Sequence, residues 1–134
     1  MIFIDTSAFY AMEVQTDVNH NTASLVKADI AKNKYGLLYT TNNIINEALT
    51  LFLFKVGHKE AVGFGDKVRK SKSLKIIRID EGIEDSAWDI FKNHDDNELS
   101  FTDCTSFVVM KELEIERAFD LHFSQMGFET LPSE

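Results

Sequence analysis

The chain alternates short apolar runs with longer segments of helical periodicity. The apolar runs cover residues 1–4, 36–40, 74–79, 117–119 and 128–131, and they are apolar on both faces. Such runs are typical of strands that are buried on both sides. The segments between them place apolar residues at helical spacing over residues 8–12, 17–32, 44–56, 59–70, 83–91 and 100–113. We therefore predict an α/β fold, a three-layer α/β/α sandwich around a mostly parallel sheet.

Polar residues at the segment boundaries support this division. Thr6 and Ser7 carry hydroxyl groups that can cap the first helix, and Asn42 or Asn43 can cap a later one. In a parallel α/β sheet, ligands bind beyond the carboxyl ends of the strands, near the point where the strand order reverses. We therefore expect functional residues at that edge of the sheet.

Length and composition predict a single domain over residues 1–134. The 134 residues include six glycines, one proline and no repeat of fixed period. No apolar run approaches the roughly 20 residues that a membrane span requires, so no membrane association is expected. We also expect no signal peptide. Cys104 is the single cysteine and has no partner for an internal disulfide, which favours a reducing, cytoplasmic location.

The charge is divided unevenly along the chain. The formal net charge is −8, but residues 1–79 hold 11 basic and 7 acidic residues, whereas residues 80–134 hold 3 and 15. The basic residues concentrate in one stretch, which is either a solvated helix surface or a patch that faces phosphate groups. Composition alone does not choose between the two. The stretch consists of Lys55, Lys59, Lys67, Arg69, Lys70, Lys72, Lys75 and Arg78.

Four carboxylates fall where the predicted fold brings them to one edge of the sheet. Asp5 and Asp120 directly follow apolar strands, Asp103 lies in the first turn of a helix, and Glu47 lies beside the apolar stripe of another helix. Each also has a simpler explanation, because an aspartate at a helix start stabilises backbone amides and a glutamate beside an apolar stripe is often merely exposed. Asp80 follows a strand too, but it is better explained as an acid at the start of the next helix.

Carboxylates that lie close together repel one another and resist ionisation. A hard divalent cation removes that conflict, and Mg²⁺ or Mn²⁺ prefers oxygen ligands. Zinc is a poor candidate, because the chain has one cysteine and no helical ligand pair among its four histidines. His122 can approach the site, but a surface histidine is the simpler expectation. The sequence therefore predicts a Mg²⁺ or Mn²⁺ site made of carboxylates.

Four segments resemble the PIN domain family, particularly its VapC-type toxins. They are Ile-Asp-Thr-Ser-Ala at residues 4–8, Asn-Glu-Ala-Leu at residues 46–49, Leu-Ser-Phe-Thr-Asp-Cys-Thr-Ser-Phe at residues 99–107, and a closing segment over residues 119–132. In the closing segment, the interval before Asp120 is two residues shorter than is usual in the family. The resemblance covers essentially the whole chain.

This resemblance implies a fold, a site and partners. The fold is a five-stranded parallel sheet with flanking helices, and the assembly is a homodimer whose active site an antitoxin occludes. The site is a quartet of acids that holds one or two Mg²⁺ or Mn²⁺ ions. By motif position, its members are Asp5, Glu47, Asp103 and Asp120.

The expected activity is metal-dependent hydrolysis of RNA phosphodiester bonds by the toxin of a type II toxin–antitoxin pair. Asp5 and Asp103 would bind the ion directly and Asp120 directly or through water, while Glu47 would position or deprotonate the attacking water.

Other residues are expected to support this chemistry. Thr6, Ser7 and Thr102 are candidate hydrogen-bond donors to the carboxylates, although helix capping is the simpler role for them. Part of the basic stretch is expected to hold the RNA backbone, namely Lys55, Lys59, Lys67, Arg69, Lys70 and Lys72.

Two other classes of protein remain open. A catalytically inactive PIN-like domain would serve dimerisation or protein binding. Haloacid-dehalogenase-like phosphotransfer enzymes also place an aspartate after the first strand, but they expect a second aspartate where this chain has Ser7. Metal-dependent cleavage of RNA that is abolished in Asp5→Asn would separate the nuclease from both.

Overall fold

Five parallel strands form the centre of the protein. A computed structural model describes residues 1–95, 99–121 and 128–132. Its strands lie in the order β3-β2-β1-β4-β5, and each neighbouring pair is parallel. The predicted parallel sheet is therefore confirmed. The strands are β1 (Ile2–Ile4), β2 (Leu38–Thr41), β3 (Leu74–Ile77), β4 (Arg117–Phe119) and β5 (Glu129–Leu131).

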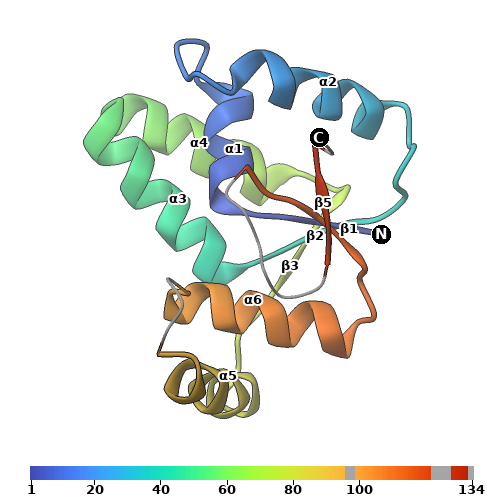
Figure 1. Cartoon of the computed structure of the whole chain (residues 1–134). Helices are drawn as coiled ribbons and strands as arrows, with labels where there is room; N and C mark the ends of the chain where they lie inside the picture. The colour runs from blue at the N-terminus through green and yellow to red at the C-terminus, as the bar shows by residue number, and fades with distance from the viewer. Residues whose placement is uncertain (96–98, 122–127, 133–134) are drawn as a thin grey trace.

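Helices cover both faces of the sheet. In Figure 1, α1 to α4 lie on one side of the strands and α5 and α6 on the other, which confirms the three-layer α/β/α architecture. No helix in the described segments is long and apolar enough to cross a membrane. The helices are α1 (Thr6–Glu13), α2 (His20–Ala31), α3 (Asn42–Lys55), α4 (His58–Lys70), α5 (Glu81–Asn93) and α6 (Phe101–Glu112).

The central strand β1 is buried on both faces, as its composition predicts. Ile2, Phe3 and Ile4 are exposed by 3% or less. The polar residues of the neighbouring strand β2 are satisfied internally, because the Thr40 hydroxyl donates to the Ile4 carbonyl oxygen at 2.9 Å. A parallel strand between two helical layers has no solvated face, so apolar side chains on both of its sides stabilise it.

Two helix starts differ from the sequence prediction. Thr41, rather than Asn42 or Asn43, caps α3, and its hydroxyl accepts a hydrogen bond from the Ile44 N–H at 3.1 Å. The helix α1 begins at Thr6 with Asp5 as its N-cap residue, and no side chain caps it. The prediction that Thr6 or Ser7 caps this helix is therefore wrong, and both hydroxyl groups are available for other contacts.

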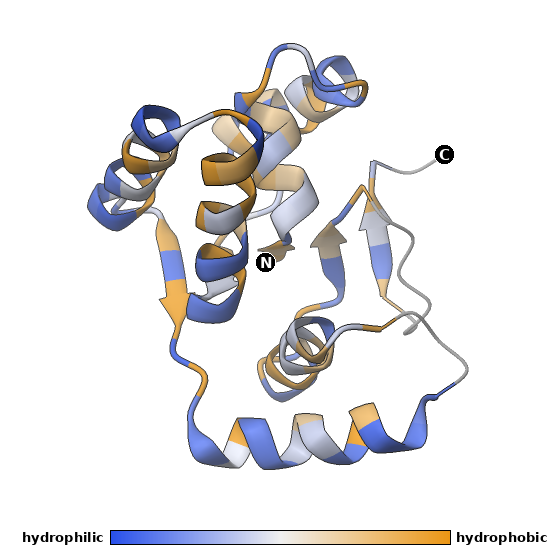
Figure 2. Cartoon of the chain, turned by 90° about the vertical axis from the view of Figure 1, so that its left-hand side faces the viewer, coloured by the Kyte–Doolittle hydropathy of each residue, from blue (hydrophilic) through white to orange (hydrophobic). Residues whose placement is uncertain are grey.

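Aromatic rings pack α1 against the hairpin formed by α3 and α4. Phe52 stacks on Phe64 with ring centroids 4.7 Å apart, and Phe9 and Tyr10 of α1 contact these rings at 5.3 and 5.4 Å. Hydropathy colouring shows hydrophobic residues on α1 and α3, whereas α4 is largely hydrophilic (Figure 2) and packs through buried residues that include Phe64. This packing fixes α3, and with it the position of Glu47, relative to α1.

Substitution of Phe52 should test this packing. Phe52 is 2% exposed, so Phe52→Ala should lower the free energy of unfolding by about 3–5 kcal/mol, because the smaller side chain leaves a cavity in the core. Phe54 lies on the same helix and is 80% exposed, so Phe54→Ala should change it by less than about 0.5 kcal/mol. Urea unfolding followed by circular dichroism measures both. Equal destabilisation of the two variants would contradict the arrangement of α3.

Candidate active site

The strand order reverses between β1 and β4, and two of the four acids stand at this reversal. Asp5 directly follows β1, and Asp120 directly follows β4. Their backbones continue the sheet, because the Asp5 N–H donates to the Phe119 carbonyl at 3.0 Å and the Asp120 N–H donates to the Leu131 carbonyl at 3.1 Å. This reversal is where α/β sheets bind ligands. The short interval before Asp120 therefore still leaves it beside Asp5.

Glu47 reaches the same edge from α3, which begins at the carboxyl end of β2. Its Oε1 accepts a hydrogen bond from the hydroxyl of Thr6 at 2.5 Å. Thr6 is the residue after Asp5 and is buried, whereas Glu47 is largely exposed. Although Glu47 is exposed on its helix, this hydrogen bond directs its carboxylate toward the start of α1.

Asp103 approaches from the first turn of α6, where it also takes part in a capping box. Its Oδ2 accepts from the Ser100 N–H at 3.0 Å, and its own N–H donates to the Ser100 hydroxyl at 3.0 Å. Ser100 is therefore the N-cap residue of α6. The box orients the Asp103 carboxylate while leaving Oδ1 outside the cap.

Hydroxyl groups at the start of α1 hold two of the carboxylates. Besides the contact of Thr6 with Glu47, the Ser7 hydroxyl donates to Asp120 Oδ1 at 3.2 Å and accepts from the Leu121 N–H at 3.0 Å. No hydrogen bond joins the Thr102 hydroxyl to a carboxylate within the described part of the chain; the Thr102 carbonyl instead accepts from the Thr105 hydroxyl at 2.7 Å.

This arrangement changes the pKa of Asp5. Burial raises its pKa most, and the charges of Asp120, Asp103 and Glu47 raise it further, whereas a hydrogen bond from the Thr6 backbone lowers it. The net effect raises the pKa of Asp5 from 3.8 to about 8. Without a cation, Asp5 therefore keeps its proton at pH 7.

Asn43 makes a contact that its expected role as a helix cap does not include. Its side-chain amide donates to the Thr105 hydroxyl at 3.3 Å and so joins α3 to α6. Asn43 lies four residues before Glu47 and thus on the same side of α3, and Thr105 lies two residues after Asp103. The spacing from Glu47 is the one sequence signal that could have indicated this contact.

The chemistry of the four acids fits a hard divalent cation, because all the donors are carboxylate oxygens. As the side chains are placed, however, no group of three or more carboxylate, imidazole or thiol groups is arranged to hold a metal ion in residues 1–95, 99–121 and 128–132. The hydrogen bonds described above hold three of the carboxylates to their own neighbours. Convergence on one ion therefore requires side-chain rotation. His122 lies outside the described residues.

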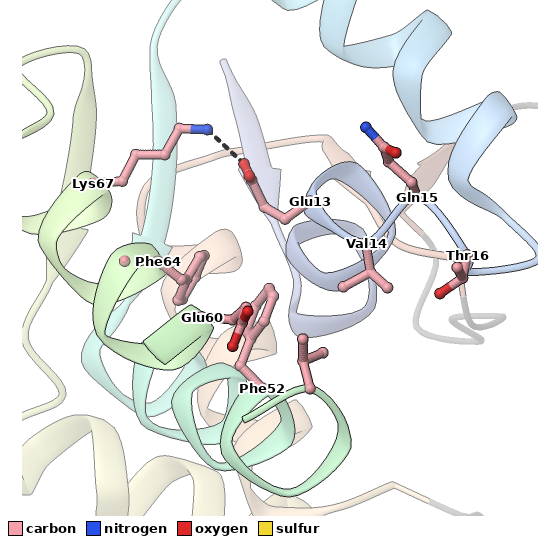
Figure 3. Close-up of a pocket in the computed structure, with 10 residues that line it drawn as sticks. Glu13, Val14, Gln15, Thr16, Phe52, Glu60, Phe64 and Lys67 are labelled. Carbon is pink, nitrogen blue, oxygen red and sulfur yellow. Dashed lines mark hydrogen bonds and ion pairs between the residues drawn. The ribbon is translucent and has the colours of Figure 1, made fainter. Parts of the chain in front are cut away.

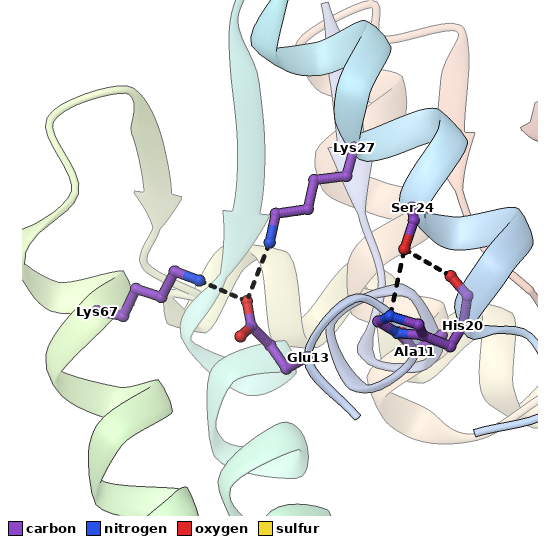
Figure 4. Close-up of polar contacts among 6 residues, drawn as sticks. All are labelled: Ala11, Glu13, His20, Ser24, Lys27 and Lys67. Carbon is purple, nitrogen blue, oxygen red and sulfur yellow. Dashed lines mark hydrogen bonds and ion pairs between the residues drawn. The ribbon is translucent and has the colours of Figure 1, made fainter. Parts of the chain in front are cut away.

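The basic residues occupy a different part of the molecule, the α3–α4 hairpin and the turn after it. Lys67 pairs with Glu13 of α1 at 2.7 Å, and Lys27 of α2 lies 3.9 Å from the same carboxylate oxygen (Figure 4). Among the described residues, Lys67 is the one member of the six candidate RNA contacts in an ion pair. The other five are Lys55, Lys59, Arg69, Lys70 and Lys72, all of them exposed.

A cleft of about 440 Å³ lies at the other end of α1 from Asp5. Phe52 and Phe64 contribute apolar surface to it, and Glu13, Glu60 and Lys67 contribute charge (Figure 3). None of the four acids lines this cleft. It is therefore distinct from the carboxylate site.

Comparison with known proteins identifies the family. The model of the PIN domain family matches residues 2–129. The chain belongs to the PIN domain family. The resemblance inferred from the four motifs is thereby confirmed, and the PIN domain replaces the haloacid-dehalogenase-like alternative.

Relatives of this PIN domain include VapC proteins. The 23S rRNA-specific endonuclease VapC20 of Mycobacterium tuberculosis is 35% identical over 130 residues, which cover 96% of this chain and 95% of that protein. A VapC ribonuclease of Archaeoglobus fulgidus is 32% identical over 123 residues, which cover 90% of this chain and 78% of that protein.

Solved structures agree with this relationship. The crystal structure of M. tuberculosis VapC20, described as a Sarcin-Ricin loop cleaving toxin, matches with a TM-score of 0.86 at 34% identity, over 96% of both chains. FitAcB from Neisseria gonorrhoeae matches with a TM-score of 0.65 over 97% of this chain and 96% of that chain. Its identity is 14%, so this second match shows the fold alone.

The raised pKa of Asp5 predicts how stability depends on pH. Because the folded-state pKa lies above the unfolded value, the stability that neutral Asp5 contributes is complete below about pH 4 and is lost as the pH rises toward 8. In metal-free protein, this residue should lower the free energy of unfolding by up to about 1.4 kcal/mol per pH unit in that window. Asp5→Asn should remove this slope and be more stable than wild type at pH 7.

Urea unfolding in EDTA between pH 4 and 8 measures the effect. Asp85→Asn removes an equal charge from an exposed position on α5 and should keep the wild-type slope. The same slope in Asp5→Asn and wild type would contradict the raised pKa.

Proposed function

We propose that this PIN domain is a metal-dependent endoribonuclease that hydrolyses RNA phosphodiester bonds as the toxin of a VapBC-like pair. One observation carries the proposal: carboxylates that follow β1 and β4 and lie on α3 and α6 gather at a single edge of the sheet, where burial and then their charges raise the pKa of Asp5. The names of the VapC relatives, two of which state RNA cleavage, support it.

In this proposal, Asp5, Asp103 and Asp120 would hold Mg²⁺ or Mn²⁺, with Asp5 in its ionised form. The ion, when bound, supplies positive charge that activates water and offsets charge on the phosphate oxygens. Glu47 positions or deprotonates the attacking water, and the Thr6 hydroxyl fixes the rotamer of Glu47.

Ser7 is proposed to orient Asp120. Its hydroxyl is itself oriented by the Leu121 N–H, so its proton is directed toward the carboxylate. Thr102 is a weaker candidate for such a role, because its hydroxyl makes no hydrogen bond to a carboxylate within the part of the chain that the structure describes.

The proposed substrate is RNA, and ribosomal RNA of the large subunit is the first to test, because VapC20 is named as a 23S rRNA-specific endonuclease. We further propose an antitoxin partner, a homodimer, a cytoplasmic location and a single domain over residues 1–134. The exposed basic residues of the α3–α4 hairpin would contact the RNA backbone.

Cleavage assays test the proposal directly. With Mg²⁺ or Mn²⁺, wild type should cut 23S rRNA or a mixed single-stranded RNA, and EDTA should abolish the activity. Asp5→Asn and Asp103→Asn should each lower the rate by about 100-fold or more, because each removes a charge that the reaction requires. Asp85→Asn, a charge-matched control outside the site, should keep the wild-type rate.

The opposite outcome favours the inactive PIN-like domain. If wild type cuts neither RNA with either metal, and calorimetry detects no Mn²⁺ binding, the nuclease proposal fails.

Salt dependence tests the basic residues. In an Asp5→Asn background, Lys59→Gln combined with Lys70→Gln should weaken RNA binding. A plot of the logarithm of the RNA association constant against log[salt] has a negative slope. The magnitude of this slope should decrease by about 0.7 for each phosphate group that is no longer neutralised. Filter binding between 50 and 200 mM NaCl measures this slope. Lys92→Gln, on α5, is the control and should leave it unchanged. An unchanged slope in the double variant would place the RNA elsewhere.

A further inference from the structure

A pair of hydrogen bonds joins the two helices that carry Glu47 and Asp103. The Asn43 side-chain amide on α3 donates to the Thr105 hydroxyl on α6 at 3.3 Å, and that hydroxyl donates to the Thr102 carbonyl at 2.7 Å. We call this pair of hydrogen bonds the Asn43–Thr105 bridge. Within the described part of the chain, no other hydrogen bond links α3 to α6.

The chemistry of the bridge requires a hydrogen-bond donor at position 43. A threonine hydroxyl has a single proton, and Thr105 directs its proton toward Thr102. The hydroxyl can therefore only accept from Asn43. Thr105 is 0% exposed, so bulk water does not replace this partner if it is lost. An asparagine amide supplies the donor without adding charge beside the acids.

The bridge lies close to two of the acids along their helices. Asn43 precedes Glu47 by four residues, or about one helical turn. Asp103 lies between Thr102 and Thr105 in the first turn of α6, so the bridge holds the turn that carries this acid. The start of α3 lies against α6 (Figure 1), but α3 packs far more extensively against α4. The bridge is therefore a direct restraint on the distance between the starts of α3 and α6.

The other hydrogen bonds of the site orient carboxylates and do not set this distance. The Ser100 N–H orients Asp103 within α6, and the Thr6 hydroxyl holds Glu47 to α1. The carboxylates must rotate before they can act on one ion and its water. Rotation brings their oxygens to the right places only if the backbones of the helices are correctly spaced. A displacement of about 1 Å is enough to lower an enzymatic rate by about 100-fold.

We propose that Asn43 is a positioning residue of the active site, which sets the separation between Glu47 and Asp103 through Thr105. The inference rests on the proposed function, in which Asp103 binds the ion and Glu47 acts on the attacking water. Asn43 contacts neither the ion nor the RNA and acts through the distance between α3 and α6. Without the bridge, repulsion between the two acids moves them apart, so the affinity for the ion and the rate of cleavage fall.

Metal affinity tests the positioning role without relying on activity. Calorimetric titration of metal-free protein with MnCl₂ measures the dissociation constant of Mn²⁺. Asn43→Leu keeps the size of the side chain but removes the donor, and Thr105→Val removes the hydroxyl. Each should raise this constant at least about tenfold, as is typical when a residue that orients metal ligands is lost. Thr105→Ser keeps the hydroxyl and should stay within about twofold of wild type.

Two further measurements separate the bridge from general damage. Asn43→Leu combined with Thr105→Val should bind Mn²⁺ no more weakly than the weaker of the two single variants, because both substitutions remove the same bridge. In RNA cleavage at saturating Mn²⁺, kcat of each single variant should fall at least about tenfold. KM should change by less than about twofold, because the basic residues of the α3–α4 hairpin still contact the RNA.

The neighbouring asparagine provides a matched control. Asn42 lies in the same turn of α3, and its Oδ1 accepts from the Ile79 N–H at 2.7 Å. This hydrogen bond joins α3 to the segment between β3 and α5, which carries none of the four acids. Asn42→Ala should therefore leave the dissociation constant of Mn²⁺ within about twofold of wild type. Circular dichroism confirms that each variant is folded.

Two results would overturn the positioning role alone. One is wild-type Mn²⁺ affinity in Asn43→Leu and Thr105→Val. The other is equal weakening in Asn42→Ala, which would show that the site responds to any loosening of α3. Failure of the proposed function differs, because wild type itself would then bind no Mn²⁺ and cut no RNA, and the positioning role would be rejected with it. Loss of Mn²⁺ affinity confined to the bridge variants supports the role even if wild type cuts no RNA, a result that would reject only the nuclease.

Discussion

Burial of a carboxylate among other carboxylates, at the carboxyl edge of the sheet, is the constraint on which the rest of this site depends. Asp5 is partly buried beside three other acids, and this environment raises its pKa to about 8. The other three carboxylates accept hydrogen bonds from hydroxyl or backbone donors. Three helices, α1, α3 and α6, also begin at this edge and direct the positive ends of their dipoles toward it. The fold thus supplies partial positive charge where the negative groups collect.

At the start of α1, the side chains that would cap the helix bind carboxylates instead. A threonine and a serine after an aspartate usually cap a helix, and capping stabilises a helix by about 1 kcal/mol. Here Thr6 and Ser7 lie inside the helix, and their hydroxyl groups donate to Glu47 and Asp120. These two hydroxyl groups therefore bind carboxylates in place of capping the helix.

The surface is divided between two kinds of contact. The α3–α4 hairpin is basic and exposed, which suits a polyanion, whereas α5 is acidic and carries exposed aromatic rings, which suits a protein surface. The acidic overall charge therefore does not exclude RNA, since the two signs lie on different elements.

The sequence by itself determined the layers of the fold and the identities of the acids. Its doubly apolar strands require helices on both faces, and Asp5 and Asp120 follow two of these strands directly. Local pattern did not determine the partners of Thr6 and Ser7 or the bridge from Asn43 to Thr105, because these contacts join residues 41 to 114 positions apart. Only the packing of the helices around the sheet decides which hydroxyl reaches which carboxylate. A short polar side chain has several local conformations of similar energy, and a hydrogen bond to a residue far away in the sequence stabilises one of them.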